Sequence, residues 1–143
     1  MSDFYDMGEE GLDDAVEPTP VPAGEYRVKI IDWMTDDEGN VIRLDTNDAP
    51  FILPKLSVID CEGADYAPDF TYFLRMPNDE QTAKEKNKSK FNLRAFFQAF
   101  DLNYGGRIEW EEAIGAEADA LLGIEHDTGF GEKNRVEQFI APK

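Results

Sequence analysis

Cysteine and histidine are almost missing from this chain of 143 residues, which contains one of each. A single cysteine, Cys61, excludes an internal disulfide framework and is typical of a protein of the reducing cytosol. Cys61 also lacks the neighbours of a catalytic nucleophile, because the sole histidine, His126, lies far along the chain. Without clustered Cys and His there is no typical metal-binding motif of these residues.

Long apolar runs and catalytic motifs are missing as well. No apolar run approaches the roughly 20 residues of a membrane-spanning helix, and the N-terminus lacks the basic and apolar regions of a signal peptide. There is no phosphate-binding glycine loop followed by Lys-Ser/Thr, and no Gly-x-Ser-x-Gly turn. We therefore expect a cytoplasmic, non-membrane protein without a cofactor and without enzymatic activity.

Basic residues are scarce, with 14 lysines and arginines against 31 aspartates and glutamates, which gives a net charge of −17. Such an acidic surface repels phosphate at long range, so any nucleic-acid site has to be a local groove. The acidity leaves two other classes open. One is a cation-binding protein, and the other is an acidic mimic of DNA that occupies the basic cleft of another protein.

Half of the basic residues lie in one quarter of the chain, between Phe70 and Arg107, and aromatic residues are interleaved with them. This combination is typical of a single-stranded nucleic-acid site, since bases stack on rings and phosphates pair with Lys and Arg. The simpler interpretation is a solvated lysine turn ahead of a core helix. The basic residues of this segment are Arg75, Lys84, Lys86, Lys88, Lys90, Arg94 and Arg107.

The first 20 residues contain seven acidic residues and no basic one, together with two glycines and two prolines. A segment with so little apolar surface cannot offset the entropy that it loses on ordering. We therefore expect a flexible acidic arm over residues 1–21 and one folded domain over residues 22–143. The arm would compete with phosphate for the basic groove or dock on a basic partner such as a polymerase.

Periodicity predicts a mainly β protein with one main helix. The helix is expected to run for about a dozen residues from Ser89 as its N-cap, because four apolar residues recur at helical spacing. The order of strands and helix is that of the five-stranded Greek-key barrel of the OB fold. The apolar stripe consists of Leu93, Phe96, Phe97 and Phe100. The five expected strands cover Glu25–Trp33, Phe51–Cys61, Asp69–Met76, Ala120–His126 and Arg135–Ile140, with Pro54 marking an edge or a bulge. Val41–Leu44 is expected to be extended.

A calcium-type pattern follows the predicted helix. Asp101, Asn103 and Glu112 occupy positions 1, 3 and 12 of an EF-hand-like loop, with glycine at position 6. Gly105 leaves position 5 without a side-chain ligand, and Arg107 places a cation over the site. A helix end followed by a Gly-Gly turn explains the same residues, so calcium binding is kept as an alternative.

Several short motifs resemble those of the phage-encoded single-stranded DNA-binding proteins of OB fold, over about residues 22–140. They are Gly24-Glu25-Tyr26-Arg27-Val28 at the start of a strand, the apolar helix, Leu122-Gly123, and the closing Gly131-Glu132-Lys133-Asn134-Arg135-Val136. The resemblance implies a protein that coats single strands during phage replication or recombination without catalysis. Such proteins often recruit replication or recombination partners through an acidic C-terminal tail. This chain ends instead with Phe139-Ile140-Ala141-Pro142-Lys143, so either the N-terminal arm takes that role or the tail is absent from the chain.

The outward positions of the predicted strands supply a candidate groove for single-stranded DNA. Two aromatic residues, Trp33 and Phe73, would stack on bases while the cations follow the phosphates. Each position also has a structural interpretation: Trp33 would cap the barrel core and Phe73 would pack under a loop. The strand residues are Arg27, Lys29, Trp33, Lys55, Phe73 and Arg75, and a mobile loop adds Lys84, Lys86, Lys88 and Lys90.

Overall fold

The computed structural model describes residues 4, 6, 8, 12–127 and 131–142, and it is mainly β. No helix in this described part of the chain has both the length and the hydropathy that a bilayer crossing requires. In chain order the elements are β1 (Gly24–Trp33), β2 (Arg43–Leu44), β3 (Pro50–Ile52), β4 (Pro54–Ile59), a 3-10 turn (Ala64–Tyr66), β5 (Phe70–Thr71), β6 (Leu74–Arg75), α1 (Ala83–Ala99), α2 (Trp110–Ala113), β7 (Glu117–Asp127) and β8 (Gly131–Ile140).

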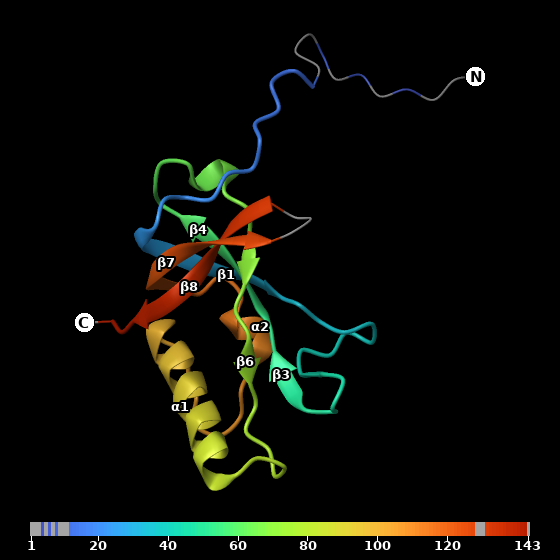
Figure 1. The fold of residues 1–143 in the computed structure, drawn as a ribbon, viewed down its shortest axis with the longest axis vertical. Helices are drawn as coiled ribbons and strands as arrows, with labels where there is room; N and C mark the ends of the chain where they lie inside the picture. The colour runs from blue at the N-terminus through green and yellow to red at the C-terminus, as the bar shows by residue number, and fades with distance from the viewer. Residues whose placement is uncertain (1–3, 5, 7, 9–11, 128–130, 143) are drawn as a thin grey trace.

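Five strands form one antiparallel sheet in the order β5-β4-β1-β7-β8. The outer strands β5 and β8 also contact each other, so the sheet nearly closes into a barrel (Figure 1). The long helix α1 lies between β6 and β7 in the sequence and packs at one end of the barrel. This arrangement confirms the predicted fold class, a five-stranded barrel of OB type with one main helix.

A second sheet of three short strands, in the order β2-β3-β6, lies beside the barrel (Figure 1). The sequence predicted one continuous strand over Phe51–Cys61, and this prediction is wrong because the chain changes sheets at Leu53. Pro54 has no N–H to donate, so the hydrogen-bond ladder is interrupted there, with β3 in the small sheet and β4 in the barrel. The predicted strand Asp69–Met76 likewise divides into β5 and β6.

Helix α1 begins earlier than the sequence analysis placed it. The Thr82 hydroxyl accepts a hydrogen bond from the Glu85 N–H at 3.2 Å, and the Glu85 carboxylate accepts one from the Thr82 N–H at 2.9 Å. This capping box starts the helix at Ala83, and Ser89 is a buried residue inside it. The lysine stretch is therefore helical and does not form a loop.

The apolar stripe of α1 is buried, as its spacing predicted, and it closes one end of the barrel. The Phe96 ring lies 4.8 Å from that of Phe100 and 5.4 Å from that of Phe139 on β8. Tyr72, between β5 and β6, stacks on Phe96 at 6.2 Å and meets Phe139 edge-on at 4.9 Å. The rings thus join the helix to both outer strands of the barrel.

Val21 belongs to the folded core, which moves the predicted arm boundary toward the N-terminus. Its side chain is 2% exposed, and its backbone N–H and C=O both bond the Asn134 side chain, at 3.0 and 2.8 Å. Thr19 also donates its N–H to the Tyr66 carbonyl. The described residues 12–18 are exposed and lead away from the barrel (Figure 1).

Replacement of Asn134 by alanine is expected to lower the free energy of unfolding by about 3 kcal/mol, since it leaves buried backbone groups of Val21 and Gly123 without partners. Urea denaturation monitored by circular dichroism measures this loss. Asn92→Ala is the matched control, because Asn92 is exposed on α1, and its effect should stay within about 0.5 kcal/mol. Equal effects of the two substitutions would contradict a structural role of Asn134.

Candidate nucleic-acid interface

A cross-strand row of two arginines and one phenylalanine spans the small sheet. Arg43 on β2 is directly opposite Phe51 on β3, and Phe51 is directly opposite Arg75 on β6. The two guanidinium carbons lie 5.5 and 6.0 Å from the centroid of the Phe51 ring, within the range of cation–π attraction. The ring is therefore flanked by a cation on each side and is itself buried.

Phe73 adds an exposed ring to this row. It stacks on Phe51 with a centroid distance of 5.1 Å and an interplanar angle of 28°, and the Arg75 guanidinium carbon lies 5.0 Å from its centroid. Half of Phe73 remains solvent-accessible. We call Arg43, Phe51, Phe73 and Arg75 the platform. An exposed ring that stacks on a second ring and is bordered by a cation is suited to stacking of a nucleobase.

Arg75 holds the platform together and has little capacity left for phosphate. Its guanidinium donates to the Asp45 carboxylate at 2.9 Å and to the carbonyl oxygens of Ala49 and Pro50 at 3.0 and 3.3 Å. Hydrogen bonds from the backbone N–H groups of Ala49 and Asn47, followed by the Arg75 guanidinium, lower the pKa of the Asp45 carboxyl. Arg75 thus fixes the β2–β3 hairpin against β6.

Two predicted lysines lie on the outer face of the barrel sheet, on the strands β4 and β1. Lys55 on β4 is paired in register with Thr71 on β5, two residues before Phe73. Lys29 on β1 is opposite Ser57, two residues after Lys55, so both lysines share the outer face of the sheet. Lys55 makes only a long contact of 4.0 Å with Asp69, and Lys29 has no ion-pair partner among the described residues.

Arg27 lies on the same strand but is neutralised by its neighbours. Its guanidinium contacts the carboxylates of Glu117 at 3.4 Å and Asp119 at 3.2 Å on β7, and both raise its pKa, with Asp119 the stronger influence. The alternative interpretation of Arg27, as a cation that balances nearby carboxylates, matches this geometry.

Trp33 does not face the predicted groove, and that prediction is wrong. The register between β1 and β4 shifts between Ile30 and Asp32, so one extra residue is inserted before Trp33. Such a bulge reverses which side chains point inward, and Trp33 is only 4% exposed. Its indole N–H donates to the Trp110 carbonyl at 2.7 Å, and the two indole rings meet edge-on at 5.1 Å.

The four predicted lysines all lie on the first two turns of α1. Lys86 pairs with Asp79 at 3.1 Å. Lys84, Lys88 and Lys90 are exposed and have no ion-pair partner within the described ranges. They are cationic, but they belong to a different element from the platform.

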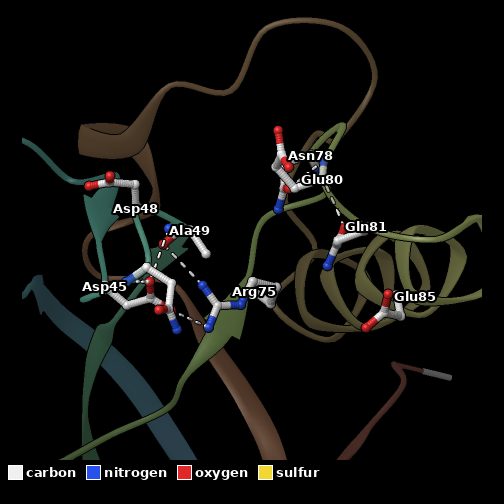
Figure 2. A pocket seen from close by; sticks show the side chains of 9 residues that line it. Asp45, Asp48, Ala49, Arg75, Asn78, Glu80, Gln81 and Glu85 are labelled. Carbon is white, nitrogen blue, oxygen red and sulfur yellow. Dashed lines mark hydrogen bonds and ion pairs between the residues drawn. The ribbon is translucent and has the colours of Figure 1, made fainter.

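An acidic cleft of about 630 Å³ separates the platform from α1. Figure 2 shows Arg75 directed toward Asp45 on one side, with Gln81 and Glu85 on the other. A phosphate chain that ran from the platform to the lysines would cross carboxylates and be repelled. Phe73 and Arg75 are therefore in contact, Lys55 and Lys29 lie on the outer face of the barrel sheet, and the helix lysines lie on a separate element. The carboxylates that line the cleft belong to Asp45, Asp48, Glu80 and Glu85.

The residues of the calcium-type pattern lie along the loop between α1 and α2 and in α2. Asp101 lines one hollow with Arg27 and Glu117, whereas Asn103 and Glu112 line another beside Arg107. In the described part of the chain, no group of three or more acidic, His or Cys side chains is arranged to hold a metal ion. Calcium binding by this segment stays an untested alternative.

Arg43 and Phe51 were missed by the sequence analysis, although a local signal exists. The turn Asp45–Ala49 is centred on Asn47, and Arg43 and Phe51 are equidistant from that centre. Recognition of this turn as a hairpin would have paired the arginine with the ring. The contact of Phe51 with Phe73, more than 20 residues later, has no local signal in the sequence.

Asp45→Ala is expected to lower the melting temperature at neutral pH, because the carboxylate holds the hairpin and Arg75. A lowered pKa means that this stabilisation is complete above the ordinary carboxyl pKa of about 3.9 and is lost as the pH falls through the lowered value. The difference in melting temperature between wild type and variant should therefore narrow in acid. Asp37→Ala, at an exposed position of the preceding turn, is the control and should show no difference at either pH. A gap that is independent of pH would rule out the charged contact.

No protein-family model matches this chain, and a search of curated proteins finds no match either. The case for a function therefore comes from the geometry of the platform and from the short motif resemblance in the sequence.

Proposed function

We propose that this protein binds single-stranded DNA without catalysis and coats it in the host cytoplasm during phage replication or recombination. The observation that carries the proposal is the exposed Phe73 ring, which stacks on Phe51 and is bordered by Arg75. Arg43 adds a second cation beside the Phe51 ring. The resemblance of the sequence to phage single-stranded DNA-binding proteins supports the biological setting.

The position of the platform on the barrel supports the same proposal. OB folds bind oligonucleotides on the face of their second and third barrel strands and through the loop between the first and second. In this chain those barrel strands are β4 and β5, and the β2–β3 hairpin lies in the connection from β1 to β4. Lys55 and Phe73 lie on or beside that face.

The charge distribution favours single strands over duplex. Duplex bases are already stacked and do not offer a free face to Phe73, whereas an unpaired base does. A duplex also presents a higher density of phosphates to a chain of net charge −17. Three cations of the face are not tightly paired to carboxylates: Lys29, Arg43 and Lys55.

Labelled oligo-dT is expected to bind at least about tenfold more tightly than the matching duplex, because stacking contributes roughly 1–3 kcal/mol per base. Fluorescence anisotropy at several salt concentrations measures both affinities. With three phosphate contacts, the logarithm of the affinity should fall by about 2 for each tenfold rise in salt. Equal affinity for duplex, or no binding to oligo-dT at low salt, would refute the proposal.

Phe73→Ala is expected to weaken oligo-dT binding by about 5- to 150-fold, which corresponds to the loss of one stacked base. Phe91→Ala is the matched control, because Phe91 is a similarly exposed phenylalanine (58%, against 50% for Phe73) that lies on α1 away from the platform. The comparison requires equal melting temperatures. Equal affinity of both variants for oligo-dT would show that Phe73 does not contact the DNA.

A further inference from the structure

Helix α1 and the loop that follows it enclose an apolar groove with a basic rim. Leu93 and Phe97 are buried at the α1 side of the groove, and Tyr104 and Ile108 of the loop form the opposite wall. Lys90 and Arg94, one helical turn apart, supply the two cations that line it. The groove has a volume of about 270 Å³, which suits a few side chains of a peptide.

The described part of the acidic arm contains a segment of apolar and acidic residues, which complements the apolar groove and its basic rim. Leu12–Glu17 reads Leu-Asp-Asp-Ala-Val-Glu, and the Ala15 N–H donates to the Leu12 carbonyl at 3.1 Å, which forms a turn. Leu12 and Val16 are spaced as neighbours on one face of a helical turn, and they are 72% and 53% exposed. Three of the six residues are acidic and none is basic.

We propose that the Leu12–Glu17 segment of one copy docks in the α1 groove of a second copy. Leu12 and Val16 would enter the apolar groove, in the manner of an amphipathic helix, while Asp13 and Asp14 face the basic rim. The attraction between opposite charges is confined to this contact. The rest of the protein is acidic, so the remaining surfaces of two copies repel each other.

The geometry of the chain favours docking between copies over docking within one. The segment leaves the barrel at one end, and α1 lies at the other end of the molecule (Figure 1). The same contact would join each copy to the next in a head-to-tail series. The small groove and the exposed charges predict a weak contact that weakens further as salt rises.

A reciprocal charge-reversal experiment tests this contact in the full chain without nucleic acid, so it is independent of the proposed DNA binding. One variant carries Lys90→Glu and Arg94→Glu, and the other carries Asp13→Lys and Asp14→Lys. Each alone would place like charges at the contact and should be monomeric by sedimentation velocity. An equimolar mixture should associate, because each arm then meets a groove of opposite charge.

The control variant is Lys84→Glu with Lys88→Glu, which makes the same change in net charge on another side of α1, about 120° round the helix axis from Lys90 and Arg94. It should associate like the wild type, whose average mass should rise with concentration. Leu12→Ser with Val16→Ser should weaken association at least about tenfold and cannot disturb the core, since both side chains are exposed. A wild type that stays monomeric near about 1 mM, a mixture that fails to associate, or a groove variant that associates normally would each overturn the proposal.

Discussion

The aromatic contacts of Phe96 are the interaction on which the rest of the structure depends. This ring lies between the α1 stripe, Tyr72 of the β5–β6 connection and Phe139 of β8, so it joins the two outer strands of the barrel through one helix. The barrel is only nearly closed by its backbone pairing, and side chains complete the closure. Because Tyr72 is followed directly by Phe73, the same packing fixes the strand that presents the platform.

Excess acidity is the second constraint, because it determines which cations are available. Most described ion pairs involve a basic residue that the sequence analysis had placed in the candidate groove or in the basic segment. These scarce basic residues therefore largely balance carboxylates of the protein itself. Cations without an ion pair in the described part of the chain include two separate sets: Lys29 and Arg43 on β1 and β2, and Lys84, Lys88, Lys90 and Arg94 on the exposed side of α1. The cations held in ion pairs are Arg27, Lys55, Arg75, Lys86, Arg107 and Arg135.

The acidic cleft between these surfaces explains why one chain would have two binding surfaces. Under the proposed function, phosphate would bind near the cations of the platform, and the carboxylates of Asp45 and Glu85 would interrupt its path to the helix lysines. The helix surface combines cations with an apolar groove, which favours an acidic peptide over a nucleic acid. In the two proposals, therefore, the position of a basic residue decides which of the two partners it would bind.

Local sequence determined the fold class, the buried stripe of α1 and the alternation of Phe70–Met76, because side-chain periodicity is a property of neighbouring residues. Only the tertiary structure decided that Trp33 is buried, because the bulge before it depends on pairing with β4. The platform was likewise decided by tertiary pairing, since Arg43, Phe51 and Phe73 come from separate segments of the chain. Periodicity specifies which face of an element is apolar, whereas contacts between distant strands decide which polar and aromatic residues meet.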